Sequence, residues 1–466
     1  MKPDIAERLK QAVGPKGFTE DPTELAPHLE EWRNKFHGRA QLMLKPATTA
    51  EVSAVLAICH ANETPVVPQG GNTGLVGGQI PFGDEVLLSL ERMNRIRAVD
   101  VPNASLIAEA GVILAEAQRA ADEAGLMLPL SLAAEGSCTL GGNLSTNAGG
   151  VNVLRYGMAR AQALGLEVVL ADGRVLDLLR TLRKDNTGYD LKQLFIGAEG
   201  TLGIITAAAL RLMPKPRMQR TAFVAVPSIE AAIELLGRLQ AASGGLVDAF
   251  ELIPRLGLDF VLAHIPATSD PLAAPSPWYV LTEMSGAEGI EAAFDAALEA
   301  AIEDGIVSDA AIASNEAQRA ALWKIRETLP EAEKKESASL KHDVSVPVTA
   351  IPAYVAACIA AVAKVLPDAR PLPFGHLGDG NLHFNFQAER GTPAEPFLAH
   401  WDDVSRIVHD ITRDFGGSFS AEHGIGVLKR GDLLRYKSVA EIEVMRSLKR
   451  ALDPKNILNP GKLLPD

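Results

Sequence analysis

Residues 374–386 read FGHLGDGNLHFNF, a stretch that combines several potential ligands with a backbone that must turn sharply. The glycine-aspartate-glycine turn at residues 378–380 is followed by alternating polar and apolar residues up to Phe386, which is the period of a strand. A turn there can fold His376 back beside the strand that carries His383. The sequence therefore predicts a β-hairpin on which two imidazoles converge.

The segment AEHGIG (residues 421–426) offers a third ligand, because Glu422 precedes His423 within a glycine-bounded stretch. Two histidines and one carboxylate make a three-ligand site with an open position, which suits zinc or another divalent ion that must accept a substrate oxygen. We expect Zn²⁺ at His376, His383 and Glu422, with Mn²⁺ and Fe²⁺ as alternatives. The competing interpretation is a packed hairpin whose histidines only satisfy hydrogen bonds.

The composition describes a large globular protein. A chain of 466 residues exceeds what one core usually supports, so we expect two or three packed domains. The net charge of −13 argues against a nucleic-acid-binding protein and against a protein that binds anionic membrane surfaces. An anionic substrate must therefore find a local cationic pocket.

The cysteines and the apolar segments indicate the compartment. Cys59, Cys138 and Cys358 are odd in number and far apart, so they form neither a disulfide framework nor a CxxC metal motif. The first twenty residues lack the apolar core of a signal peptide, and the apolar run 351–363 contains Pro352 and is shorter than a membrane span. We expect a soluble, cytoplasmic protein without a membrane span.

A glycine-rich loop follows a predicted helix and strand. The helix begins at Thr49, the strand is TPVVPQ (64–69), and the loop GGNTGLVGG (70–78) lets backbone amides approach a ligand closely, as in phosphate-binding loops. A Rossmann fingerprint is excluded because a strand resumes at residues 86–90 instead of a helix, and no GK[ST] closes a Walker loop. Pyrophosphate is the expected ligand, and a glycine-rich surface turn is the alternative.

Two further stretches of small residues, 135–157 and 196–206, flank a hairpin that turns at Asp172-Gly173. After the prolines at positions 214 and 216 the composition changes, which predicts a domain boundary. Beyond it, the pattern predicts strands at 221–227 and 277–284, helices at 229–242 and 289–304, and a final helix that ends before Pro454. The middle of the chain is thus expected to be an α+β layer on an antiparallel sheet.

The chain contains the motifs PQGGNTGLVGG, LGGNLSTNAGG, GAEGTLGIIT, GHLGDGNLH, EHGIG and DPKNILNPGK in this order, within a match that runs from about Pro46 to Lys462. Together they resemble FAD-dependent D-2-hydroxyacid dehydrogenases of the vanillyl-alcohol oxidase superfamily, in the branch of D-2-hydroxyglutarate and D-lactate dehydrogenases. The resemblance implies an α+β protein with a two-subdomain FAD-binding domain (1–216), an α+β cap domain over an antiparallel sheet that carries the metal motif (217–412), and a C-terminal segment (413–466) that packs back on the FAD-binding domain.

The resemblance also assigns the cofactor residues. The first loop would bind the pyrophosphate of FAD, and the other two stretches would contact the rest of the cofactor. Some oxidases of the superfamily attach FAD to a histidine in the first loop; this loop carries Asn72 instead, so non-covalent FAD is expected. The matching positions are Pro68, Gly70, Gly71, Asn72, Thr73, Gly74, Ser137, Thr139, Gly142, Asn143, Thr146, Asn147, Gly149, Gly150, Glu199, Gly200, Gly203 and Ile205.

In the same family His376, His383 and Glu422 match the metal ligands, and His423 matches the residue taken as the catalytic base. Asn385 matches a substrate contact, and Arg326 and Lys341 match positions that hold a substrate carboxylate in dicarboxylate-using members. By charge pattern alone, Arg326 and Lys341 belong to a basic run that is typical of solvated helix faces. Some 2-hydroxyglutarate enzymes have a threonine four residues after the arginine, where this chain has Pro330.

The implied reaction is oxidation of a small-molecule D-2-hydroxy acid, D-2-hydroxyglutarate or D-malate, with hydride transfer to flavin N5 and proton transfer to histidine. The electron acceptor would be an electron-transfer flavoprotein or a quinone, and a homodimer is compatible with the sequence. A D-lactate or glycolate dehydrogenase or oxidase on the same fold is the alternative. A metallohydrolase would leave three glycine-rich loops without a role, and a non-catalytic ligand-binding protein would leave the metal ligands without one.

Overall fold

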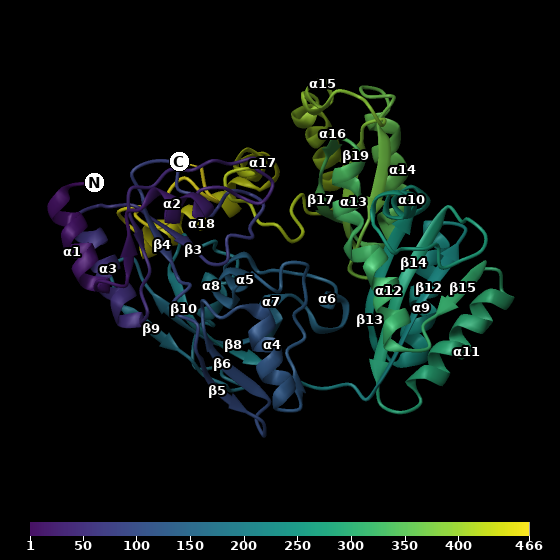
Figure 1. The fold of residues 1–466 in the computed structure, drawn as a ribbon, viewed down its shortest axis with the longest axis horizontal. Coiled ribbons are helices and arrows are strands. Elements are labelled where there is room, and N and C mark those ends of the chain that lie inside the picture. The colour runs from purple at the N-terminus through teal and green to yellow at the C-terminus, as the bar shows by residue number, and fades with distance from the viewer. Residues whose placement is uncertain (466) are drawn as a thin grey trace. The chain divides into compact units, whose positions relative to one another are not determined.

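The computed structural model describes residues 1–465, which form two compact units (Figure 1). Unit 1 comprises residues 1–150, 157–215 and 422–465, and unit 2 comprises residues 151–156 and 216–421. The chain therefore passes between the units four times. The predicted domain boundaries, after residues 216 and 412, remain a prediction, and residues 413–421 are grouped with unit 2 by compactness.

Unit 1 contains two main sheets. The first has the order β1-β2-β4-β3 with parallel pairing around β4, and the second is the antiparallel sheet β5-β6-β10-β8-β9. A short pair, β7 with β11, lies beside them. The strands are β1 (Phe18–Thr19), β2 (Met43–Leu44), β3 (Val66–Gln69), β4 (Val86–Ser89), β5 (Ile96–Asp100), β6 (Ser105–Glu109), β7 (Leu126–Met127), β8 (Ala163–Val169), β9 (Val175–Leu178), β10 (Ile204–Arg211) and β11 (Met213–Pro214).

The helices of unit 1 pack on these sheets. The predicted helix after Pro46 is confirmed, although its N-cap is Thr48, whose hydroxyl accepts a hydrogen bond from the Glu51 amide at 3.2 Å. The helices are α1 (Pro3–Val13), α2 (Pro22–Leu25), α3 (Thr49–Ala61), α4 (Leu114–Glu123), α5 (Leu140–Thr146), α7 (Ala159–Gln162), α8 (Lys192–Phe195), α17 (Arg430–Tyr436) and α18 (Val439–Leu452), together with the 3₁₀ turn η1 (Ala26–His28).

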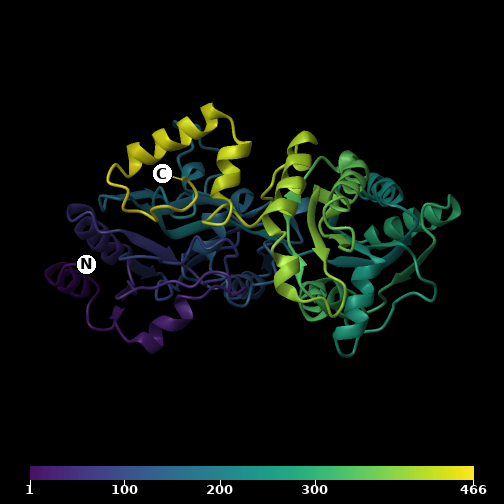
Figure 2. The same cartoon turned by 90° about the horizontal axis from the view of Figure 1, so that it is seen from above.

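The C-terminal segment of unit 1 returns to the N-terminal sheet, as the yellow ribbon in Figures 1 and 2 shows. The Val66 amide donates to the Ile457 carbonyl at 2.8 Å, and the Asn459 amide donates to the Val66 carbonyl at 2.8 Å. Leu458 thus pairs in parallel with β3, at the strand that leads into the first glycine-rich loop. The edge of this sheet is closed by residues almost 400 positions away in the sequence.

Unit 2 is built on the antiparallel sheet β13-β14-β12-β15, with helices on both faces. Ala222, Val224 and Val226 of β12 lie in a core with α9 and α11, while Phe223 and Ala225 lie in a core with α10 and α12. Because both faces are buried, the central strand reads as a continuous apolar run. The elements are α6 (Val153–Tyr156), β12 (Met218–Val226), α9 (Ile229–Ser243), β13 (Val247–Pro254), α10 (Arg255–His264), β14 (Trp278–Gly286), α11 (Ile290–Glu303), β15 (Asp309–Ile312), α12 (Glu316–Glu327) and α13 (Leu329–Glu336).

The second sheet of unit 2 has the order β16-β19-β17, and β18 pairs with β19 to form the predicted hairpin. The antiparallel sheets and flanking helices confirm the α+β class. Within residues 1–465, no helix combines the length and apolar character needed to cross a bilayer. The remaining elements are β16 (Ser339–Leu340), β17 (Asp343–Ser345), η2 (Val348–Ala350), α14 (Ile351–Val362), β18 (Arg370–Phe374), η3 (Leu377–Asp379), β19 (Asn381–Gln387), α15 (Ala394–Leu398) and α16 (Trp401–Asp414).

Candidate functional site

The three glycine-rich stretches of unit 1 meet in space. A side chain on Gly71 would collide with the Ser137 carbonyl oxygen, and one on Gly200 would collide with the ring of Pro68. The Glu199 amide also donates to the Ser145 carbonyl at 2.8 Å, which joins the second stretch to the third. Glycine is therefore required where these backbones touch, and the predicted cofactor residues form one cluster.

The first loop presents backbone amides. Asn72 adopts a left-handed conformation with φ of 54°, and its side-chain amide donates to the carbonyls of Pro27 and Glu30 at 3.0 and 2.8 Å. Within residues 1–465, the backbone N–H groups of residues 71–74 donate to no protein acceptor. Consecutive amides in such a turn form an anion-binding concavity, so the loop fits the pyrophosphate of FAD.

Several other predicted cofactor residues make hydrogen bonds within the protein. Thr139 caps α5 by accepting from the Gly142 amide at 3.4 Å, and Thr146 donates to the Gly142 carbonyl at 3.1 Å. The buried Asn143 contacts the Cys138 sulfur at 3.4 Å, and Asn147 accepts from the Arg160 amide at 2.9 Å. These four side chains shape the second stretch around α5.

Gly203 and Ile205 belong to the packing around the third stretch. A side chain on Gly203 would crowd Val168 and Phe195, and Ile205 is buried in β10. Their contacts fix where the third stretch runs past the first two. The sequence pattern identified these positions, and the structure gives them a packing role.

Glu199 holds the loop that carries His423. Its carboxylate oxygens accept from the amides of Ile425 and Gly426 at 2.7 and 2.8 Å, and the Gly150 amide donates to Glu422 Oε1 at 2.7 Å. Burial raises the pKa of Glu199 above its ordinary value, against the lowering effect of those two amides. Glu422 and His423 thus belong to unit 1 and rest on the second and third stretches.

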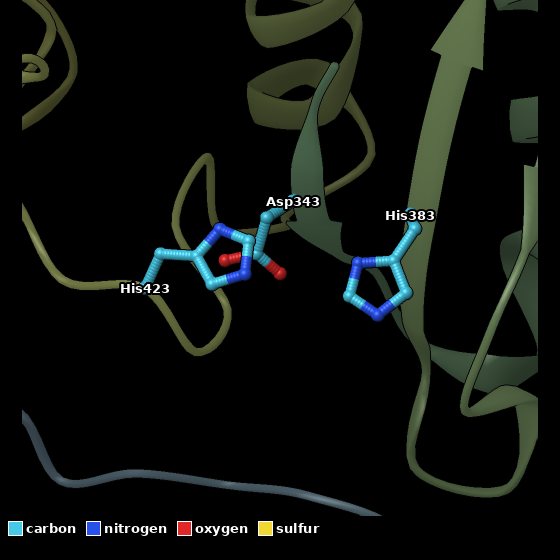
Figure 3. Close-up of side chains that lie close together, drawn as sticks. All are labelled: Asp343, His383 and His423. Carbon is cyan, nitrogen blue, oxygen red and sulfur yellow. The ribbon is translucent and has the colours of Figure 1, made fainter. Parts of the chain in front are cut away.

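In unit 2 the hairpin brings two predicted metal ligands together. The rings of His376 and His383 are 5.6 Å apart between centroids, and His383 lies opposite Phe374 in the pairing of β18 with β19. On the other side of β19, Asp343 of β17 lies opposite His383, and Figure 3 shows both side chains. The sequence pattern did not single out Asp343, which lies in a short alternating strand.

The sequence motifs also did not identify Glu251 of β13 as a site residue, although it is a charged residue in a mostly apolar strand. Its buried carboxylate accepts from His376 Nδ1 and from Arg326 Nε, each at 2.7 Å. Burial alone would raise the pKa of Glu251, but the charges and hydrogen bonds of His376 and Arg326 outweigh it and lower the pKa to about 2. The guanidinium of Arg326 also stacks over Phe374, 5.3 Å from the ring centroid.

The other predicted substrate residues meet at a second buried carboxylate, Glu333 of α13. Lys341 Nζ lies 2.6 Å from Glu333 Oε2, and the side-chain amide of Asn385 lies 2.9 Å from Glu333 Oε1. The Asn385 oxygen accepts from the His342 amide at 3.1 Å. Both predicted cations of unit 2, Arg326 and Lys341, are therefore held by protein carboxylates.

Two family models match most of the chain. One, described as an FAD binding domain, matches residues 40–179, and the other, described as the C-terminal domain of FAD linked oxidases, matches residues 215–463.

Three relatives are similar to this protein over nearly the whole chain. A D-2-hydroxyglutarate dehydrogenase of Xanthomonas citri pv. viticola is 40% identical over 98% of this chain and 96% of its own length. The mitochondrial D-2-hydroxyglutarate dehydrogenase of Arabidopsis thaliana is 40% identical over 98% of this chain and 81% of its own length. A putative mitochondrial D-lactate dehydrogenase of Schizosaccharomyces pombe is also 40% identical, over 95% of this chain and 85% of its own length.

Solved structures share the fold. Alkyldihydroxyacetonephosphate synthase has a TM-score of 0.78 at 19% identity, covering 99% of this chain and 85% of that protein. p-Cresol methylhydroxylase has a TM-score of 0.78 at 17% identity, covering 99% of this chain and 96% of that protein. These likenesses confirm the predicted fold of the vanillyl-alcohol oxidase type.

Proposed function

The chain belongs to the FAD-linked oxidase family, as an FAD-dependent dehydrogenase, and from this premise we propose that it oxidises D-2-hydroxyglutarate, or D-malate, to the 2-oxo acid. We favour a dicarboxylate because of the hydrogen bonds that Arg326 makes within the protein. Glu251 engages only its Nε, and in the described part of the chain Nη1 and Nη2 donate to no protein group. A guanidinium held in this way offers two parallel donors, the geometry that binds a carboxylate in bidentate fashion.

We further propose that His376, His383 and Glu422 hold one divalent ion, with zinc as the expected metal. Imidazole and carboxylate donors suit zinc, and because His376 Nδ1 is engaged with Glu251, we propose Nε2 as the ligand atom. Glu422 follows Ser418 by four residues, and Ser418 exchanges backbone hydrogen bonds of 2.9 and 2.8 Å with Ser345 of β17.

When bound, FAD supplies the two-electron acceptor, and the divalent ion supplies positive charge that lowers the pKa of the substrate hydroxyl. The remaining work falls to the protein. The amides of residues 71–74 bind the pyrophosphate, and Arg326, with Lys341, binds and orients the acid. Neutral His423 accepts the hydroxyl proton at a ring nitrogen while the hydrogen on the same carbon leaves as hydride.

We also propose a cellular compartment, an electron acceptor and an assembly. The three cysteines are buried and free, which supports a reducing compartment and our proposal of a cytoplasmic protein. Some relatives carry mitochondrial names, so subcellular fractionation is the deciding measurement. We propose an electron-transfer flavoprotein or a quinone as electron acceptor, and a homodimer as the assembly.

A D-lactate dehydrogenase is the second candidate, because the fission-yeast relative is as similar to this chain as the 2-hydroxyglutarate enzymes are. Overall identity therefore does not choose between the two substrates. The distinction depends on what Arg326 and Lys341 bind, since D-lactate has no second carboxylate.

Steady-state oxidation of a panel of acids with an artificial electron acceptor tests the proposal. The panel contains D-2-hydroxyglutarate, D-malate, D-lactate, glycolate and the L-enantiomers, and the visible flavin spectrum of the purified protein is recorded first. We expect flavin absorbance and a kcat/KM for D-2-hydroxyglutarate or D-malate that exceeds the value for D-lactate. A higher kcat/KM for D-lactate would establish the second candidate instead.

A further inference from the structure

Glu251 is a buried carboxylate that no sequence motif identified, and it contacts one proposed metal ligand and one proposed substrate anchor at once. Building on the proposed function, we infer that Glu251 is a positioning residue that sets both the metal-binding nitrogen of His376 and the direction of the Arg326 guanidinium. It touches neither metal nor substrate in this account, and it acts through these two side chains.

The backbone fixes Glu251 where it can do both. Leu252, the next residue of β13, exchanges two backbone hydrogen bonds with Gly375, at 2.8 and 3.0 Å. This bridge joins β13 to the residue immediately before His376, so the two bridged backbone segments bring the carboxylate and the imidazole together. Gly375 has a φ of 128°, a conformation that L side chains rarely adopt, which lets the chain leave the bridge towards His376.

The contact with His376 determines the imidazole tautomer. A carboxylate only accepts hydrogen bonds when ionised, so the 2.7 Å contact with Glu251 Oε1 requires a proton on His376 Nδ1. In a neutral imidazole the lone pair is then on Nε2, which is the form that ligates a metal. Carboxylates that orient metal-binding histidines in this way typically contribute about 10- to 100-fold to metal affinity.

The contact with Arg326 determines which donors of the guanidinium remain for an acid. Glu251 Oε2 accepts from Nε at 2.7 Å, and the Phe374 ring supports the guanidinium plane, 5.3 Å from its centre. The Nη1 and Nη2 groups are thereby directed away from Glu251 as a fork. One carboxylate thus couples the placement of the metal ligand to the placement of the substrate anchor.

A purely structural ion pair is the competing explanation, and unit 2 contains a matched example. Glu283 of β14 is buried like Glu251 and binds Arg319, another residue of α12, with Nε and Nη2 contacts of 2.7 and 3.0 Å. Trp323 also donates to Glu283, at 2.9 Å. The two pairs lie on adjacent strands and the same helix, but only Glu251 also contacts a histidine of the hairpin.

The experiment compares Glu251→Gln with Glu283→Gln in the full chain with FAD bound. Zinc affinity is measured by competition with a chromophoric chelator, which does not depend on turnover, and KM is measured for D-2-hydroxyglutarate and D-lactate. We expect Glu251→Gln to lose about 10- to 100-fold in zinc affinity and to raise KM more for the dicarboxylate. Glu283→Gln should lose thermal stability while keeping both properties of the wild type.

Glu251→Asp is a second test variant in case Glu251→Gln does not fold. It keeps the charge, but its side chain is one methylene too short to reach both partners. We expect it to fold and to lose zinc affinity, the KM preference, or both. Wild-type zinc affinity together with a wild-type KM ratio in folded Glu251→Gln or Glu251→Asp would overturn the inference and leave the proposed function intact. A wild-type protein that binds no zinc, or oxidises no 2-hydroxy acid, would instead refute the proposed function itself.

Discussion

Replacing Arg326 with alanine tests which acid the protein binds. The side chain is buried on α12, and its proposed partner is the distal carboxylate of a dicarboxylic substrate. Hydrogen bonds to a charged group contribute about 1.5–3 kcal/mol each, so the loss of even one of the two proposed bonds should raise KM for D-2-hydroxyglutarate by about 10- to 150-fold. KM for D-lactate should change much less, because lactate has no distal carboxylate to lose its partner.

The Arg326→Ala variant should also be less stable than the wild type, for a reason that the sequence did not reveal. Removing Arg326 leaves Glu251 buried with His376 as its remaining partner, and breaking a buried ion pair typically costs about 3–5 kcal/mol of stability. The proposed metal ligand His376 is disturbed as well, but that effect is common to both substrates. The ratio of the two KM values therefore isolates the carboxylate contact, whereas kcat for a single substrate does not.

Arg319→Ala is the matched control, because Arg319 lies on the same helix and pairs with the buried Glu283. The assay is steady-state oxidation of both acids at 25 °C, after circular dichroism has shown that each variant is folded. We expect Arg319→Ala to keep the wild-type KM ratio. Equal penalties on D-lactate and D-2-hydroxyglutarate in Arg326→Ala would refute the assignment of a dicarboxylate.

Three further outcomes are expected. Acid precipitation should release FAD into the supernatant, because the first loop carries Asn72 and no histidine; flavin that remains with the pellet would show a covalent bond. Elemental analysis should find about one zinc per chain in the wild type and much less in His383→Ala, and full activity of the chelated protein would remove the metal from the mechanism. His423→Ala should lose about 10²- to 10⁴-fold in rate while keeping flavin and metal, and a smaller loss would mean that another group accepts the proton.

The sequence predicted elements whose pattern is local. The alternation of β19, the glycine turn before it and the periodic helices α9 and α11 each depend on a few neighbouring residues, and all four are confirmed. The glycine-rich loops were also recognisable, because a backbone that touches another backbone excludes side chains over a short, contiguous stretch.

The sequence did not reveal pairings between distant residues. Glu251 lies 125 positions before His376 and 75 before Arg326, and nothing in its apolar neighbourhood indicates either partner. Glu333 was equally hidden, because in sequence it belongs to a charged helix, PEAEKKE, that is typical of a solvated face. For the same reason Lys341 appeared as part of a solvated basic run, whereas its ammonium group is held by Glu333.

The four passages of the chain between the units affect how the protein is made on the ribosome. Unit 2 consists almost entirely of residues 216–421. Nearly all of it has therefore been synthesised before translation reaches the segment of unit 1 that begins at residue 422. Val66, in contrast, must wait for Ile457 and Asn459, which are synthesised almost 400 residues later. The first glycine-rich loop directly follows that strand, so the nascent chain cannot complete the sheet that carries this loop before residues 457–459 have been made. Ribosomes stalled shortly before residue 457 should therefore carry a protease-resistant unit 2 and an FAD-binding unit that is still open to cleavage.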